Sequence, residues 1–390
     1  MLFDENNLEI TAKTLAGLED VLSAEIERLG GRDISLHSRA VTFFGDTALL
    51  YKANLHVRTA LKFLIALKKF QVRNDKQFYE QCLDIEWESF ITPNMTIAVD
   101  STVNSPHFNH ANYVALKLKD AVVDRLRDYY GGRPDVDVNN PDIRLNVYIS
   151  GEDCVISLDS SGNSLHKRGY RVSQTDAPLN EVLAAGLILL SGWNAETDLY
   201  DPMCGSGTIV TEAYMFAAGI PPGNFRKFSF MNWKNYNEAL WTRIKNESKA
   251  FIIEPQVKIS CADISSKAIS VTFRNLEEIG IEKKIDVRRR DFIKAKPEME
   301  NTTLIMNPPY GERMDDEDVE AFHKQIGDKL KQDYKGNVAW VLSGNMAALK
   351  MFGLRHAKQF ILMNATIECR FRKFELYEGS RKSKYNSDPD

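Results

Sequence analysis

The feature that most restricts the fold is an alternation of strand-like and helix-like segments after about residue 164. Short apolar runs alternate there with longer segments whose apolar residues recur at helical spacing. We expect one strand that ends at residue 200 and further strands at 257–262, 285–288, 303–306 and 338–342. We expect helices at 179–190, 265–279, 319–332 and 346–352, and another that follows the first strand and ends at residue 218. This alternation predicts an α/β fold with a parallel, doubly wound sheet. Two adjacent strand-like runs, 360–363 and 366–376, predict a terminal antiparallel hairpin on that sheet.

The first part of the chain follows a different pattern. Residues 1–60 read as strand, helix, strand, strand and helix, which is compatible with a small ferredoxin-like α/β unit. Residues 61–163 mix strands with one helix and end at the turn-forming run 159–163. We therefore expect domains at residues 1–60, 61–163 and 164–390.

Composition places the chain among ordinary globular proteins. It has 390 residues, of which 43% are hydrophobic and 27% charged. The apolar stretch 182–190 is far shorter than the roughly 18 residues that a membrane span needs, and the N-terminus is acidic where a signal peptide is basic. These features predict a cytoplasmic protein with no membrane partner. The five cysteines show no clustered spacing with histidine, so neither a zinc site nor a disulfide framework is expected.

The distribution of charge hints at a polyanionic partner. The net charge is −4, which argues against an indiscriminate nucleic-acid coat. Basic residues nevertheless cluster after residue 165. The clusters are His166, Lys167, Arg168 and Arg171, and the runs 288–290, 370–373 and 381–384. Such runs are usually solvated faces, so this indication is weak on its own.

A glycine-containing turn lies where the first strand of the parallel sheet meets its helix. The run Asp-Pro-Met-Cys-Gly-Ser-Gly-Thr begins at Asp201 and includes Gly205 and Gly207, which would let the backbone approach a ligand. A tight turn without a ligand would explain the glycines equally well. A dinucleotide is disfavoured, because Val210 replaces the third glycine and Asp263 lies far beyond the roughly 20 residues expected for the ribose carboxylate. A nucleoside whose ribose hydroxyls bind Asp263 remains attractive, although Asp263 could instead cap the helix that follows.

Two further strand ends carry residues suited to a nucleobase. Asp291 could accept a hydrogen bond from an adenine amine while Phe292 supports the ring, or the pair could be a surface carboxylate and a core side chain. Asn307-Pro308-Pro309-Tyr310 is a sharper signal, because consecutive prolines stiffen the turn after an apolar strand. The Asn307 side chain and the Pro308 carbonyl are two acceptors for one exocyclic amine, and Tyr310 can stack on its ring. Holding both amine hydrogens would aim the nitrogen lone pair at an electrophilic methyl group.

These motifs resemble those of a known family. Residues 201–208 and the run Asn-Pro-Pro-Tyr-Gly-Glu-Arg at 307–313 resemble the cofactor and amine motifs of class I S-adenosylmethionine-dependent methyltransferases. The run Leu-His-Lys-Arg-Gly-Tyr-Arg at 165–171 is similar to the junction in THUMP-domain RNA methyltransferases, specifically the bacterial 23S rRNA guanine-N2 enzymes. The closing run 371–377 also resembles this family. Some members carry a second methyltransferase domain at the C-terminus. The sequence of this chain has room for only one such domain, so one reaction is expected.

The resemblance implies roles for individual residues. The cofactor implied is S-adenosylmethionine, and no metal ion is expected in the site. The cofactor-binding residues would be Asp201, Pro202, Gly205, Gly207, Asp263 on the ribose, and Asp291 and Phe292 at the adenine. Asn307, Pro308 and Tyr310 would hold the target base. RNA would be contacted by His166, Lys167, Arg168, Arg171 and Arg313. The N-terminal 163 residues would comprise the ferredoxin-like unit and a THUMP-type RNA-binding region.

The function expected from this resemblance is methylation of a guanine N2 amine in 23S rRNA. A tRNA guanine-N2 or DNA adenine-N6 methyltransferase remains an alternative, because the Asn-Pro-Pro-Tyr motif serves several planar amines. A non-catalytic RNA-binding factor in ribosome assembly is the alternative from another class, which the intact motif residues disfavour. The sequence indicates neither the target nucleotide nor the oligomeric state.

Overall fold

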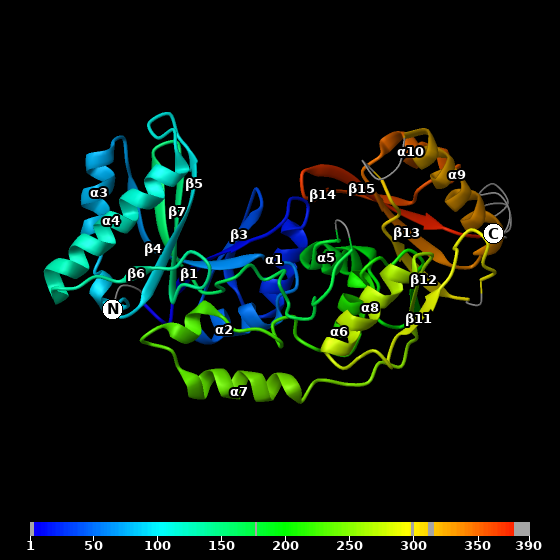
Figure 1. Ribbon diagram of the computed structural model, residues 1–390, viewed down its shortest axis with the longest axis horizontal. Helices are drawn as coiled ribbons and strands as arrows, with labels where there is room; N and C mark the ends of the chain where they lie inside the picture. Colours follow the sequence, from blue (N-terminus) through cyan, green and yellow to red (C-terminus); the bar gives the residue numbers. More distant parts are fainter. Residues whose placement is uncertain (1–3, 176–177, 298–299, 311–315, 378–390) are drawn as a thin grey trace, which may run out of the picture. The chain divides into compact units, whose positions relative to one another are not determined.

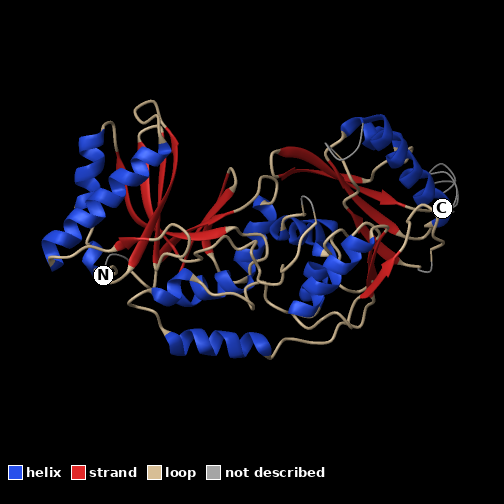
Figure 2. Cartoon of the chain, in the orientation of Figure 1, coloured by secondary structure: helices blue, strands red, loops and turns tan. Residues whose placement is uncertain are grey.

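The computed structural model describes residues 4–175, 178–297, 300–310 and 316–377, drawn as a ribbon in Figure 1. The chain divides into two compact units, whose helices and strands are coloured in Figure 2. The first unit comprises Met1–Leu15, Leu22–Arg168 and Pro221–Ala250, and the second comprises Ala16–Val21, Gly169–Ile220 and Phe251–Asp390. The main chain therefore passes between the units several times.

The first unit contains one sheet whose described strands lie in the order β2-β3-β1-β4-β8-β7-β5-β6. The strands are β1 (Leu8–Lys13), β2 (Arg32–His37), β3 (Ala40–Gly45), β4 (Lys62–Gln71), β5 (Thr96–Asn104), β6 (Asp135–Val136), β7 (Ile143–Ser150) and β8 (Asp153–Asp159). β4 pairs antiparallel with β1 on one side and with β8 on the other. The two regions expected before residue 163 therefore share a single sheet.

The described helices of the first unit include two that the sequence analysis did not foresee. The helices are α1 (Glu19–Arg28), α2 (Thr47–His56), α3 (Asp75–Leu83), α4 (Ala111–Tyr130) and α7 (Glu238–Lys249), with short 3₁₀ turns η1 (Trp87–Ser89) and η2 (Ser229–Asn232). α3 and α7 were not expected. Both begin at an asparagine whose side chain accepts a backbone hydrogen bond, Asn74 from Gln77 and Asn237 from Leu240, each at 3.0 Å. These caps are sequence signals that could have revealed the two helices.

The segment Pro221–Ala250 departs from the expected domain division. The sequence analysis placed it in the range 164–390, whereas it packs in the core of the first unit. The ring of Phe230 stacks on Tyr51 of α2 at 4.3 Å between centroids, and Trp241 of α7 meets Phe230 edge-on at 5.3 Å. Residues 164–168 also belong to the first unit. The physical reason is that the segment's aromatic face finds its partners on α2.

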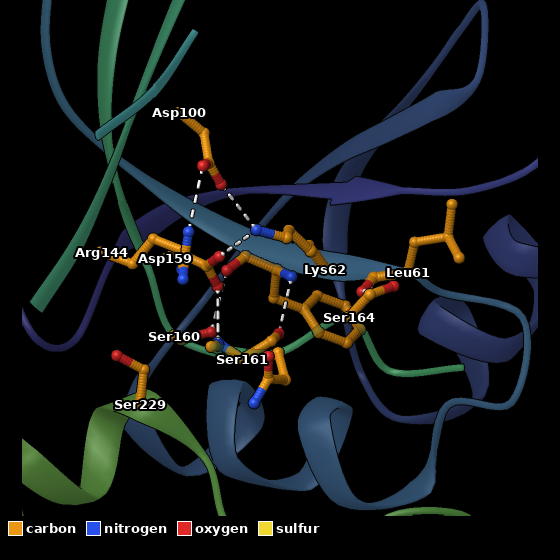
Figure 3. Close-up of polar contacts among 12 residues, drawn as sticks. Leu61, Lys62, Asp100, Arg144, Asp159, Ser160, Ser161, Ser164 and Ser229 are labelled. Atoms are coloured by element: carbon orange, nitrogen blue, oxygen red, sulfur yellow. Dashed lines mark hydrogen bonds and ion pairs between the residues drawn. The ribbon is translucent and has the colours of Figure 1, made fainter. Parts of the chain in front are cut away.

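A charged network joins the strands of the first unit near the end of β8 (Figure 3). Lys62 donates to the carboxylates of Asp159 at 2.8 Å and Asp100 at 3.0 Å, and Arg144 donates to Asp100 at 3.0 Å. The Asp159 side chain is buried and also accepts the backbone N–H of Ser161. The two carboxylates outweigh the effect of burial and raise the pKa of Lys62 above its ordinary value.

The second unit contains a sheet whose described strands lie in the order β11-β10-β9-β12-β13-β15-β14. The strands are β9 (Asp198–Asp201), β10 (Ile259–Asp263), β11 (Asp286–Arg289), β12 (Thr302–Met306), β13 (Val338–Ser343), β14 (Lys358–Asn364) and β15 (Ile367–Glu375). β9 to β13 pair in parallel, and β14 and β15 form an antiparallel hairpin beside β13. This arrangement confirms the parallel, doubly wound sheet and the terminal antiparallel hairpin.

Helices cover both faces of this sheet (Figure 1). They are α5 (Glu181–Ser191), α6 (Thr208–Ala217) and α8 (Ser266–Glu278) on one face, and α9 (Asp316–Asp333) and α10 (Met346–Met351) on the other. α9 and α10 contribute Ile326, Leu330 and Leu349 to an apolar core with Leu304 and Met306 of β12. The doubly wound order brings the ends of β9, β10, β11 and β12 to one edge, which is where such sheets bind ligands.

Candidate active site

The ends of four parallel strands line one cavity of about 310 Å³ in the second unit. The structure brings together most of the residues expected to bind the cofactor or the target amine. Those that line the cavity are Asp201, Pro202, Gly205, Asp263, Asp291, Phe292 and Asn307. Gly207, Pro308 and Tyr310 belong to the same loops but are not part of its lining. Thr175, Pro178, Leu179 and Ile264 also line it, and the sequence analysis missed them.

The glycine turn after β9 is held in place by α8. Gly205 and Gly207 have φ angles of +55° and +77°, which side-chain-bearing residues rarely adopt. A Cβ atom on Gly207 would lie 2.7 Å from Cγ2 of Thr272, so only glycine lets the turn pack on the helix. Thr272 Oγ1 donates to the Gly205 carbonyl at 3.1 Å, and Asn275 Nδ2 donates to the Ser206 carbonyl at 3.0 Å. The backbone of Gly205 therefore faces the cavity in a fixed conformation.

Asp201 contributes a buried carboxyl to the lining of the cavity. Its side chain is 1% exposed and accepts the backbone N–H of Met203 at 3.1 Å. Burial raises the pKa of Asp201 to about 8, and the negative charge of Asp263 adds to the rise. A strongly shifted carboxyl inside a cleft is typical of a functional site.

Asp263 is fixed by two backbone groups. Its Oδ2 accepts the N–H of Gly205 at 3.0 Å and its Oδ1 accepts the N–H of Ser265 at 2.9 Å. Each carboxylate oxygen keeps a further lone pair. The orientation suits two adjacent hydroxyl groups, and the side chain ties the glycine turn to β10 as well.

The residues expected at an adenine ring have unequal exposure to the cavity. Asp291 Oδ1 accepts the N–H of Ile293 at 3.0 Å, and its other oxygen lies 3.5 Å from Lys294 Nζ. Phe292 is 3% exposed and its ring stacks on Tyr334 at 5.4 Å between centroids. Phe292 therefore reaches the cavity at its edge while most of the ring belongs to the core.

Asn307 carries the most informative polar atom of the site. Its Oδ1 is buried, and among the residues that the structure describes none donates a hydrogen bond to it. A buried acceptor without a donor is costly, and native proteins retain few of them. Because Asn307 lines the same cavity as Gly205 and Asp263, a ligand that donates hydrogen bonds fits there.

Tyr310 lies on the hairpin side of the Asn-Pro-Pro-Tyr loop. Its hydroxyl accepts a hydrogen bond from Asn364 Nδ2 at 2.8 Å and lies 3.5 Å from the Cys369 thiol. The sequence analysis missed Asn364 and Cys369, because nothing in the pattern says which strand lies beside the loop.

Two of the five residues expected to contact RNA have a different role. Arg168 is 2% exposed, and its guanidinium donates to the carbonyls of Leu165 and Arg58. Arg171 donates to Glu181 at 2.6 Å and to the hydroxyls of Ser206 and Thr208. The expectation for both is corrected, because their donors already bind the protein.

The other three residues keep their expected role as a prediction. Lys167 is exposed, and His166 is half-buried with Nδ1 2.8 Å from Ser164 Oγ. Arg313 lies outside the described residues.

The described residues contain neither a metal-binding cluster nor a membrane-spanning helix. Within the described ranges, no group of three or more His, Cys, Asp and Glu side chains is placed to hold a metal ion. No helix in the same part of the chain has the length and apolar character needed to cross a membrane.

Three family models match consecutive parts of the chain. Residues 168–373 match the model described as RMKL-like, methyltransferase domain. Residues 72–159 match the THUMP domain, and residues 9–64 match the RlmL ferredoxin-like domain. Together the matches follow the order of units expected from the sequence.

Relatives and solved structures are similar over nearly the whole chain. A Synechocystis sp. protein that carries the name of an RNA methyltransferase is 36% identical over 369 residues, which are 94% of this chain and 96% of that protein. The ribosomal RNA large subunit methyltransferase K/L of Shewanella frigidimarina is 34% identical over 94% of this chain, which spans only 52% of that protein. A crystal structure named as a methyltransferase, SMU.472, complexed with SAH, superposes with a TM-score of 0.87 and 28% identity, covering 97% of this chain and 100% of that one.

Proposed function

Because the chain belongs to the RMKL-like methyltransferases that carry THUMP and RlmL ferredoxin-like domains, we propose that it methylates the exocyclic N2 amine of a guanine in 23S rRNA. The family uses S-adenosylmethionine. The observation that carries the proposal is the buried Oδ1 of Asn307, which receives no hydrogen bond from the described residues and lines the same cavity as Gly205 and Asp263. A planar amine supplies the donor that this oxygen requires.

The residues of the cavity fit the cofactor. The Gly205 backbone leaves room for its methionine end, and the carboxylate of Asp263 is oriented to accept two ribose hydroxyls. Asp291 and Ile264 line the part of the cavity next along the sheet edge, where an adenine would lie. When bound, S-adenosylmethionine supplies a methyl group on a positively charged sulfur, which an amine can displace directly.

The chain's contribution to the reaction is alignment. Asn307 Oδ1 and the Pro308 carbonyl accept the two amine hydrogens, and the two prolines restrict the backbone that carries both acceptors. The nitrogen lone pair is thereby aimed at the methyl group. Alignment of this kind contributes on the order of 7–11 kcal/mol to lowering a barrier.

The RNA substrate must present its base outside the helical stack. Extruding a base costs a few kcal/mol, which binding elsewhere on the RNA has to offset. The first unit, which contains the THUMP match, is the part of the chain that we assign to this binding. The exposed Lys167 and the half-buried His166 lie at its C-terminal end and are the candidates nearest in sequence to the second unit.

The experiment combines product analysis with one substitution. Nucleoside mass spectrometry after reaction with 23S rRNA should show N2-methylguanosine. Asn307→Ala should lower the rate roughly 100-fold or more, as expected when an acceptor that acts in the transition state is removed, with SAH affinity unchanged. Removing a buried acceptor that lacks a donor should not lower the melting temperature. N6-methyladenosine as the product, abolished by the same substitution, would overturn the choice of base and support a DNA- or RNA-adenine enzyme.

A further inference from the structure

The ring of Tyr310 lies against Gly344, the residue that follows β13. A Cβ atom on Gly344 would be 3.2 Å from Cδ2 and Cε2 of Tyr310 and 2.6 Å from Cγ2 of Ile367. Both distances are shorter than ordinary van der Waals contact. Gly344 therefore lets the ring pass close to the backbone beside the β14–β15 hairpin.

The hydroxyl of Tyr310 is fixed from that hairpin. Asn364, the last residue of β14, donates from Nδ2 to the hydroxyl oxygen at 2.8 Å. Cys369 of β15 is buried and places its thiol 3.5 Å from the same oxygen. Asn364 pairs with Ile367 across a tight turn in which Ala365 has a φ angle of +53°. Both contacts thus come from the hairpin end nearest the Asn-Pro-Pro-Tyr loop.

These contacts restrict the side-chain torsions of Tyr310, which the two prolines before it do not fix. Pro308 and Pro309 fix the backbone torsions before Tyr310, but they do not fix the torsions of its side chain. A ring that receives a flat base must present one face in a defined direction. Restraining the hydroxyl at the far end of the ring holds that direction before the base arrives, which reduces the ordering cost of binding.

We propose that Asn364 is a positioning residue for methyl transfer, acting by holding the ring of Tyr310 in the orientation that stacks on the target base. The inference rests on the proposed function, since it concerns the same target base. It makes the tip of the β14–β15 hairpin part of the base site. A base fits between the acceptors of the loop and a ring whose far edge the hairpin holds.

A double-mutant cycle on the full-length protein tests the hydrogen bond. Asn364→Ala and Tyr310→Phe each remove one partner of it, and each should lower the single-turnover methylation rate on 23S rRNA about five- to tenfold. The double variant should be no slower than the slower single variant, because both changes break the same contact. Asn364→Leu, which has a similar size and neither a donor nor an acceptor, should behave like Asn364→Ala. Affinity for SAH should stay within about twofold throughout.

Thr366→Ala is the matched control, because Thr366 is exposed on the same turn. It should retain the wild-type rate. A wild-type methylation rate in Asn364→Ala would overturn this inference but not the proposed function. The same holds if the rate loss of the double variant equals the two single losses multiplied together, because the two residues would then act independently. A wild-type protein that methylates no amine of 23S rRNA would overturn the proposed function and this inference with it.

Discussion

At the scale of single residues, Asp201 links the site to the stability of the second unit. An aspartate in an unfolded chain has a pKa near 3.9, whereas burial raises the pKa of Asp201 to about 8. Between these values the folded protein binds a proton that the unfolded chain releases. The stabilising contribution of the protonated carboxyl is therefore complete below about pH 4 and is lost as the pH rises towards 8.

Asp201→Asn should remove this pH dependence. The amide keeps the shape and an acceptor for the N–H of Met203 but does not titrate. We expect the stability of the variant relative to the wild type to rise steadily between pH 5 and pH 8, by at most about 1.4 kcal/mol per pH unit. Melting temperatures measured across that range check the prediction. Parallel curves for the two proteins would show that Asp201 does not titrate in this window.

The residues that line the cavity of the second unit could be predicted because strand ends are visible in the sequence. Asp201, Asp263, Asp291 and Asn307 each stand at or just after the end of a strand, and the ends of parallel strands meet at one edge. The structure confirms that they line one cavity. The roles of the arginines could not be predicted, because a basic run does not reveal whether its side chains face carbonyl groups. Arg171, which binds Ser206 and Thr208, supports the glycine turn from a position 30 or more residues earlier in the chain.

At the scale of secondary-structure elements, two of the three lysines of β4 lie in different environments. Lys62 is 22% exposed and binds the buried Asp159, whereas Lys69 is 53% exposed and pairs with Glu9. Removing one partner of a buried pair leaves the other charge without compensation. The two lysines therefore form a matched comparison on a single strand.

Lys62→Met should destabilise the protein by about 3 kcal/mol, at the lower end of the loss for a buried pair because Lys62 is partly exposed. Lys69→Met should change stability by less than about 0.5 kcal/mol. Adding Asp159→Asn to Lys62→Met should restore part of the loss, because it removes the buried charge. Denaturant titration of the variants measures these differences. Equal losses of stability in the two lysine variants would contradict the conclusion that the Lys62–Asp159 pair stabilises the protein more than the Lys69–Glu9 pair.

Most elements of the second unit could be predicted to within a few residues, because strands such as β10, β12 and β13 are apolar runs and helices such as α8 and α9 are amphipathic. α7 shows the limit of that reasoning. Its pattern marks Trp241 and Ile244 as a buried face but does not reveal the surface against which they pack. That surface is α2, nearly two hundred residues earlier in the chain, and only the tertiary structure identifies it.

At the scale of the whole molecule, Pro221–Ala250 is an insertion that leaves the second unit and returns at the same place. The N–H of Ile253 donates to the carbonyl of Ala218 at 3.0 Å, and a Cβ atom on Gly219 would lie 2.8 Å from the carbonyl oxygen of Phe251. The two ends of the insertion are therefore adjacent. Its aromatic side chains have their partners in the first unit.

A fragment that begins at residue 164 should consequently be poorly soluble. It would expose Phe228, Phe230 and Trp241, which are buried in the intact chain, and should aggregate or bind a hydrophobic dye. The same fragment with residues 221–250 replaced by a short Gly/Ser linker should be more soluble and should bind SAH in calorimetric titration. Both fragments lack residues 16–21, so that loss cancels in the comparison. Equal solubility of the two would contradict the packing of the insertion.

The insertion also bears on how the chain folds as it is made. Proteins usually fold domain by domain from the N-terminus during synthesis, at about 5–20 residues per second. Here the first unit cannot complete its core when Arg168 leaves the ribosome, because Phe230 and Trp241 have not yet been translated. Tyr51 and its neighbours on α2 stay uncovered for several seconds more, while β9 and α6 of the other unit emerge. The nascent chain thus presents an apolar surface during this interval, and a chaperone that binds such surfaces has its best opportunity then.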